Sequence, residues 1–168
     1  LRRGTRDAAA IYQAVLASVF GAPAGGGLHI AEIRGRSGEL GLKVSGAEGY
    51  LGRIYIGDPS ALKTRVREDD SGIAVEEDVI ADSLFDSINA PDSPINILIG
   101  AKKFMEGWNS WRVSNMGLLN IGRSEGSEII QLFGRGVRLR GRDFSLKRSS
   151  ALDGSHPEHI RLLETLNI

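Results

Sequence analysis

The run Ile95–Ile99 (INILI) narrows the choice of fold more than any other stretch, because apolar residues fill it with little alternation. This pattern is typical of a strand that is buried on both faces, as in parallel sheets covered by helices on each side. A second run of the same kind, Met116–Ile121, follows after one compact stretch. The two runs predict an α/β fold built on a mostly parallel sheet.

Segments with helical periodicity alternate with the predicted strands. In Thr5–Phe20 apolar residues recur at three- and four-residue spacing, and Gly21 and Pro23 follow as stop signals. Further helices are expected at Asp58–Arg67, at Glu77–Ile88, from about Glu128 onward and at Pro157–Leu166, and further strands at Tyr50–Gly57 and Ile73–Val75. This alternation predicts a single domain, residues 1–168, with helices on both faces of its sheet.

Residues 25–45 carry a different signal, the alternation of antiparallel strands. Apolar residues alternate on both sides of a GRSG turn, at Leu28, Ile30, Leu40, Leu42 and Val44. We expect an antiparallel hairpin here, inserted into the domain and decorating it.

Composition excludes several classes of protein. The chain of 168 residues contains no cysteine, which removes disulfides, thiolate nucleophiles and cysteine metal sites. Its apolar runs are much shorter than the roughly 18–20 residues that span a bilayer, and its start does not resemble a secretory signal. The three histidines have no spacing that predicts a metal site. We therefore expect a cytoplasmic protein without a membrane partner. The two ends of the sequence separately suggest that it is a piece of a longer polypeptide.

The net charge is zero, but the charges are segregated along the chain. Between Arg135 and Arg148 six residues are basic, and Asp143 is the one acid. Such a run is compatible with plain solvated surface, but its contents suggest an anionic partner.

Within this region the stretch QLFGRGVRL places Gln131, Arg135 and Arg138 within roughly 60° of one another on a helix. Apolar residues take the opposite side. Two guanidinium groups on one face suit a multiply charged oxyanion, although arginines at this spacing are more often solvated surface. Gly134 and Gly136 each weaken a helix by about 1 kcal/mol relative to alanine. Either something packs close to this backbone, or the helix ends near Gly136.

The same stretch is similar to motif VI of the superfamily-2 helicases and translocases, Gln-x-x-Gly-Arg-x-x-Arg, with Gln131, Gly134, Arg135 and Arg138 as the matching residues. Upstream, ILIGAKKFMEGWNSWRV resembles motif V of that superfamily. The string from GWNSWRV to GVRLRG looks most like the DEAD/DEAH-box and type III restriction (Res) subunit branch. The close resemblance covers roughly residues 95–141.

The resemblance implies the second RecA-like lobe of a two-lobe ATP-dependent DNA helicase or translocase. In that family ATP with Mg²⁺ binds between the lobes, and the missing N-terminal lobe holds the metal. Arg138 would then be the arginine finger on the γ-phosphate and Arg135 a second phosphate contact, while Gln131 and Gly134 belong to the nucleotide site. Partners implied are the N-terminal lobe of the same polypeptide, DNA, and a modification or specificity subunit.

Motif V departs from the family pattern at one position. Asn109 stands where an aspartate usually contacts the ribose, and it still offers an amide oxygen as an acceptor but no charge. Gly107 would let the backbone approach the nucleotide. Lys102 and Lys103 follow the predicted strand, where this fold brings loops near a nucleic-acid backbone; the alternative is that they are ordinary surface lysines.

The sequence has no GxxxxGK[ST] motif and no acidic DEAH-type box, so this chain alone is not expected to hydrolyse ATP. Two other functions are compatible with the same residues. A nucleic-acid-binding module would use the basic stretch 135–148 electrostatically and would bind in a salt-sensitive manner without any other lobe. A regulatory lobe would pair Arg135 and Arg138 with acidic residues of a partner.

Overall fold

The computed structural model describes residues 7–78, 88–100, 110–119, 126–136 and 141–168, with only the backbone of Asp78, Glu128 and Arg135. The chain forms two compact units, Leu1–Phe104 and Met105–Ile168. Among the described helices, none has the length and apolar character needed to cross a membrane.

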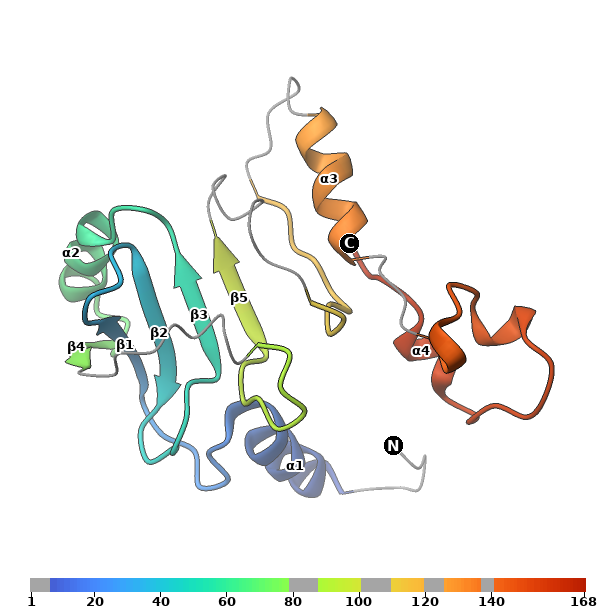
Figure 1. Cartoon of the computed structure of the whole chain (residues 1–168). Coiled ribbons are helices and arrows are strands. Elements are labelled where there is room, and N and C mark those ends of the chain that lie inside the picture. The colour runs from blue at the N-terminus through green and yellow to red at the C-terminus, as the bar shows by residue number, and fades with distance from the viewer. Residues whose placement is uncertain (1–6, 79–87, 101–109, 120–125, 137–140) are drawn as a thin grey trace. The chain divides into compact units, whose positions relative to one another are not determined.

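The first unit is built on one five-stranded sheet (Figure 1). Its strands are β1 (Leu28–Ile33), β2 (Glu39–Val44), β3 (Gly52–Tyr55), β4 (Ala74–Asp78) and β5 (Ile97–Gly100), in the order β4-β1-β2-β3-β5. The β1–β2 and β2–β3 pairs are antiparallel, whereas β1–β4 and β3–β5 are parallel. The α/β class is therefore confirmed. The described pairs make a mixed sheet, with the parallel pairs at its two ends, in place of the mostly parallel one that we expected.

The predicted hairpin is present as β1 and β2, joined by a turn in which Gly35 and Gly38 have φ of 78° and 81°. These positive φ values are accessible to glycine at little cost, which explains the GRSG sequence. Both strands lie in the interior of the sheet, because β1 also pairs with β4 and β2 also pairs with β3. The hairpin is thus the centre of this sheet and not a decoration on it.

Two helices belong to the first unit. α1 (Ala8–Phe20) ends at Gly21, which adopts the left-handed conformation, as the sequence predicts. α2 (Ser60–Glu68) begins next to Asp58, whose carboxylate accepts hydrogen bonds from the Ser60 hydroxyl and from the Ser60 backbone N–H at 2.9 Å. These two hydrogen bonds, the hydroxyl first, hold the pKa of Asp58 below its ordinary value.

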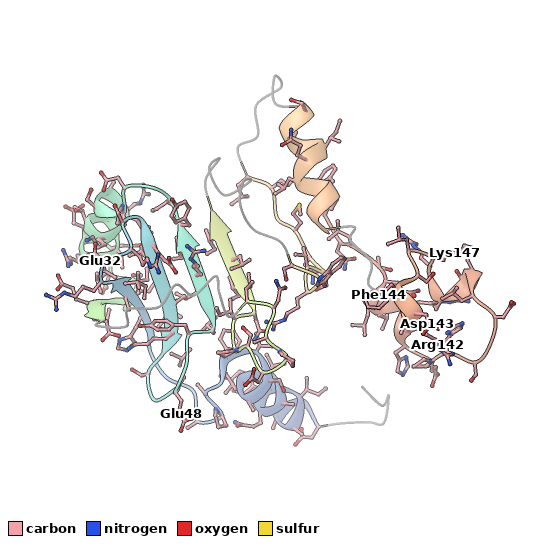
Figure 2. The ribbon with its side chains drawn as sticks, in the orientation of Figure 1. Glu32, Glu48, Arg142, Asp143, Phe144 and Lys147 are labelled. Atoms are coloured by element: carbon pink, nitrogen blue, oxygen red, sulfur yellow. The ribbon has the colours of Figure 1, made fainter. Side chains whose placement is uncertain are left out.

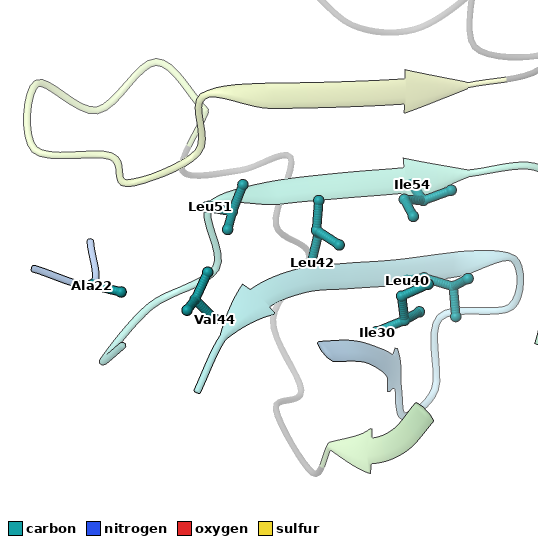
Figure 3. Close-up of a cluster of buried hydrophobic side chains, with 7 residues drawn as sticks. All are labelled: Ala22, Ile30, Leu40, Leu42, Val44, Leu51 and Ile54. Carbon is teal, nitrogen blue, oxygen red and sulfur yellow. The ribbon is translucent and has the colours of Figure 1, made fainter. Parts of the chain in front are cut away.

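One face of the sheet carries the larger apolar core (Figure 3). Its buried members are Ala22, Ile30, Leu40, Leu42, Val44, Leu51 and Ile54. Leu62 and Val66 of α2 and Phe20 at the end of α1 pack against this cluster. At the margin of this face, Lys63 Nζ of α2 lies 2.6 Å from Glu32 Oε2 of β1. Among the described helices of this unit, α2 and the last residue of α1 thus pack on this face, and the expectation of helices on both faces is not met by the described residues.

The opposite face combines a small apolar cluster with charged groups. Ala31, Ile33 and Tyr50 are buried there. The Tyr50 ring lies directly over Gly41, where a Cβ atom would come within 2.3 Å of a ring carbon. Beside them Arg53 Nη2 lies 2.8 Å from Glu39 Oε2, and each of these two side chains is only 3% exposed. The alternation of the strands thus leads to one apolar face and one face with a buried ion pair.

The second unit contains α3 (Gly126–Gly136), the short 3₁₀ helices η2 (Arg142–Phe144) and η3 (Ser149–Ala151), and α4 (Ile160–Leu163). Asn115 pairs with Asn167 in an isolated parallel bridge. α3 confirms the helix that the sequence predicts near Glu128.

Four sequence-based expectations for secondary structure are corrected. Of the predicted strand Met116–Ile121, residues 116–119 form no strand and Leu119 is 88% exposed, while residues 120–121 lie outside the described residues. β5 pairs with β3 alone among the described strands, so Ile99 is 47% exposed and the run is not buried on both faces. Glu77 belongs to strand β4 and Ile88 to a turn; the rest of that predicted helix lies outside the described residues. The last predicted helix shrinks to the four residues of α4, where Leu162 and Leu163 are exposed and contribute no core.

Candidate functional site

Helix α3 carries the glutamine, the glycine and the first arginine of the QLFGRGVRL stretch. Gln131 is exposed, whereas Ile129, Leu132 and Phe133 are half-buried. This division agrees with the two faces that the sequence predicts, although Ile130 is 71% exposed. The backbone of Arg135 is one turn further along the same helix. The helix therefore exposes Gln131, while three of its apolar side chains are half-buried.

Gly134 lies on α3 with open space beside it. No described atom lies within 4 Å of the position that a Cβ would take, so packing inside the described chain does not account for this glycine. A glycine at this position would be explained by a group that approaches the helix backbone from outside the described part of the chain.

Several predicted site residues lie outside the described residues. These are Gly107 and Asn109 of the motif V stretch, Lys102 and Lys103 after β5, and Arg138; of Arg135 only the backbone is described. β5 ends at Gly100, one residue after the end of the predicted strand Ile95–Ile99 and two residues before Lys102. The structure thus brings Gln131, Gly134 and the Arg135 backbone together on one helix.

A tight loop follows the motif, over residues 141–147. The Gly141 N–H donates to Ser145 O at 3.0 Å, the Phe144 N–H to Gly141 O at 3.1 Å and the Ser145 N–H to Arg142 O at 3.1 Å. The Lys147 N–H donates to Ser145 Oγ at 3.1 Å. A Cβ on Gly141 would lie 2.6 Å from Ser145 O, so only glycine fits at the base of this loop.

The loop holds two consecutive residues in the left-handed conformation, Asp143 at φ 54° and Phe144 at φ 60°. Aspartate tolerates this region, but for a residue as bulky as phenylalanine it costs on the order of 1 kcal/mol or more. The side chain that results is not buried: Phe144 is 78% exposed, as is Leu146. Arg142 and Lys147 are exposed on the same loop (Figure 2). We name residues 141–147 the basic–aromatic loop.

The C-terminal end of this loop is anchored by Ser149 and Glu164. The Ser149 N–H donates to Glu164 Oε1 at 2.6 Å, and its hydroxyl donates to Glu164 Oε2 at 2.8 Å. The backbone hydrogen bond, then the hydroxyl and the nearby charges of Arg148 and His156, hold the pKa of Glu164 below its ordinary value despite partial desolvation. Ser149 is 6% exposed, so this contact fixes the chain directly after the basic cluster.

Glu164→Gln is expected to lower the melting temperature of the second unit by a few degrees at pH 7. Because the folded-state pKa of Glu164 lies below its value in the unfolded chain, its contribution is complete above that unfolded value and is lost as pH falls through the lowered pKa. The two proteins should therefore converge on acidification. Tryptophan fluorescence reports this unit, to which both tryptophans belong. An equal gap between the two proteins at pH 7 and in acid would contradict the assignment.

A polar cluster on the first unit was not foreseen from the sequence. His29 Nε2 lies 2.5 Å from Ser45 Oγ, and His29 Nδ1 lies 3.7 Å from Glu76 Oε2. The other oxygen of Glu76 is 2.6 Å from Lys43 Nζ. Serine, histidine and glutamate occur here in the order of a catalytic triad. The 3.7 Å between His29 and Glu76 exceeds hydrogen-bond length, however, and Lys43 forms an ion pair with the carboxylate. The cluster therefore links β4, β1 and β2 and is assigned a structural role.

Among the described residues no group of three His, Asp or Glu side chains is placed to hold a metal ion. Comparisons with protein-family models, with curated proteins and with solved structures found no match to this chain.

Proposed function

We propose that this chain is the second RecA-like lobe of an ATP-dependent DNA helicase or translocase, and that its ATP site is completed by another lobe. Helix α3 carries the proposal: it presents the Gln-x-x-Gly-Arg sequence with Gln131 exposed and with open space at Gly134. An exposed polar face beside a bare glycine is what a site shared between two lobes requires. The sequence resemblance over residues 95–141 supplies the class of reaction.

In this proposal the chain contributes positive charge to a phosphoryl transfer whose other parts lie on the first lobe. Arg138 donates hydrogen bonds to the γ-phosphate and stabilises the charge that spreads over its oxygens in the transition state. Arg135 makes a second phosphate contact, and Gln131 holds the interface in its nucleotide-bound form. The first lobe supplies the phosphate-binding loop and the acidic pair for Mg²⁺. Gly107 and Asn109 serve the ribose side of the site.

A second candidate function, a nucleic-acid-binding module without motor activity, is favoured by a different observation. The basic–aromatic loop exposes Arg142, Phe144 and Lys147 in a unit that needs no second lobe to display them. This module would bind nucleic acid with strong salt dependence, whereas its affinity would not respond to ATP.

The Gln131→Ala change separates the two candidates. In the polypeptide with both lobes, nucleic-acid-stimulated ATP turnover should fall about tenfold, which corresponds to the loss of about 1.4 kcal/mol of transition-state stabilisation. Gln13→Ala on α1 is the matched control, because Gln13 is also an exposed glutamine on a helix. Wild-type turnover in Gln131→Ala, measured by phosphate release, would contradict the motor role of α3.

A further inference from the structure

Helix α1 has no charged residue in its 13 positions, and its only side chains with polar atoms are Tyr12, Gln13 and Ser18. A helix that is apolar on nearly all sides is normally buried in a protein core. The structure describes every residue of α1, and none of them is buried. The helix therefore lacks the cover that its sequence requires.

The larger exposed apolar side chains of α1 share one side of the helix. They lie within about 100° of one another around its axis and are Ile11, Tyr12, Val15 and Val19, with Ala8 on the same side. The four larger side chains are between 36% and 60% exposed. Their spacing of three and four residues is that of a helix that packs against a neighbour. We name these five residues the α1 stripe.

The C-terminal end of α1 is fixed to the sheet of the first unit. Phe20 packs against the larger apolar core, and Asn96 Nδ2, directly before β5, donates to the carbonyl oxygen of Val19 at 3.0 Å. The N–H of the buried Ala22 donates to Leu16 O at 3.1 Å. A helix that is already held in place loses little conformational entropy when its exposed side binds a partner.

The chemistry of α1 restricts that partner. Nucleic acids and anionic lipid surfaces are bound through lysine and arginine, and α1 contains neither. Its 13 residues are also fewer than the roughly 17–25 of a membrane-spanning helix. The complementary surface is therefore an uncharged, apolar protein surface. Four of the five large apolar side chains that are exposed in the described part of the first unit lie on α1 itself, so a second copy of the chain offers such a surface.

We propose that the α1 stripe is a homodimer interface, in which α1 packs antiparallel to α1 of a second copy across a two-fold axis. In such an interface every residue pair occurs twice. When Tyr12 lies opposite Val15 of the second copy, Ala8 lies opposite Val19 of that copy, so that each larger side chain contacts a smaller one. Antiparallel packing also brings the opposite ends of the two helix dipoles together.

This interface goes beyond the proposed function and does not depend on it, because α1 lies outside residues 95–141, which carry the resemblance. A helix of 13 residues is about 20 Å long. A pair of such helices buries at most the low end of the roughly 1,200–2,000 Å² that is typical of stable complexes. We therefore expect a monomer–dimer equilibrium with a dissociation constant in the micromolar range.

Sedimentation equilibrium of the full-length protein over a concentration series tests the interface. Val15→Glu should raise the dissociation constant of the dimer about 100-fold or more, because it places two unpaired carboxylates in an apolar interface. Gln13→Glu is the matched control: it adds the same charge to the same helix, about 160° around the axis from Val15, and it should dimerise as the wild type does. Far-UV circular dichroism checks that both variants fold.

A mixing experiment tests the antiparallel pairing. Tyr12→Lys and Val15→Glu should each be monomeric alone, whereas an equimolar mixture of the two variants should recover the dimer. In the mixed dimer the introduced ammonium and carboxylate groups are opposite each other and form an ion pair. A mixture that stays monomeric would overturn the proposed arrangement.

Three other outcomes would also contradict the proposal. The first is a wild-type protein that stays monomeric over the whole concentration series, and the second is a dimer that survives Val15→Glu. The third is a monomeric wild type whose melting temperature falls in Val15→Glu but not in Gln13→Glu. That result would assign the cover of the α1 stripe to another part of the same polypeptide.

Discussion

Arg138→Ala is expected to lower nucleic-acid-stimulated ATP hydrolysis by a factor of about 10³ or more in the polypeptide that carries both lobes. In the proposed site this guanidinium contacts the γ-phosphate across the interface and stabilises the negative charge of the transition state. Arg138→Lys should recover little, because an ammonium group lacks the planar fork of donors. Phosphate release under saturating ATP and DNA is the measurement.

Two controls decide how such a loss is interpreted. Arg65→Ala removes an exposed arginine of the same kind from α2, remote in sequence from the motif, and should leave turnover unchanged. A thermal melt of Arg138→Ala that matches the wild type shows that the fold is intact. Turnover at the wild-type rate in Arg138→Ala would refute the arginine-finger role, and an equal loss in Arg65→Ala would remove its specificity.

Local elements of this fold could be predicted because their signals are local. The GRSG turn with alternating apolar residues on each side predicts the β1–β2 hairpin, and both glycines take the positive φ that the turn needs. Gly21 ends α1 in the same way, and Asp58 accepts a hydrogen bond from the Ser60 N–H at the start of α2. The spacing of Gln131 and Gly134 also depends only on helical geometry, so that part of the candidate site followed from the sequence.

The order of the strands could not be predicted in this way. Whether INILI lies in the centre or at one end of a sheet depends on pairings between residues that are distant in sequence. β5 pairs with β3, about 45 residues earlier, and Ile99 stays half-exposed. The centre of the sheet is taken by the hairpin, which looks like an accessory element when only neighbouring residues are considered.

Backbone strain left no readable trace in the sequence either. The basic stretch is visible as composition, and RGRDFSLKR contains one aromatic residue among its cations. That Asp143 and Phe144 adopt positive φ follows from the hydrogen bonds that close the loop at Gly141 and Ser145. The aromatic residue between cations is thus the only mark of this loop that its sequence carries.

The burial of the ion pair on the sheet could not be predicted from the sequence. Glu39 on β2 and Arg53 on β3 alternate along their strands with the apolar residues of the larger core, and charged residues at such positions usually face solvent. In the antiparallel register Arg53 is opposite Gly41, so the two side chains are diagonal neighbours on one face, with Nη2 2.8 Å from Oε2. Both are 3% exposed, and the Arg53 guanidinium also lies over the Tyr55 ring, 5.3 Å from its centroid.

Glu39→Gln is therefore expected to reduce the free energy of unfolding by about 3 kcal/mol, since the change leaves the buried Arg53 guanidinium without this carboxylate. Urea unfolding followed by far-UV circular dichroism measures the loss. Glu32→Gln on the neighbouring strand is the matched control. Its partner Lys63 is 19% exposed and Glu32 itself 36% exposed, so solvent screens that pair and the loss should stay below about 1 kcal/mol.

A double replacement separates charge from shape. Glu39→Leu together with Arg53→Met removes both charges and keeps similar volumes, and it should recover most of the stability lost in Glu39→Gln, because the desolvation cost of both ions disappears. If Glu39→Gln and Glu32→Gln lose the same small amount, the pair is screened and the sheet does not depend on it. If the double variant is less stable than Glu39→Gln, the ion pair is worth more to this sheet than apolar side chains of equal size.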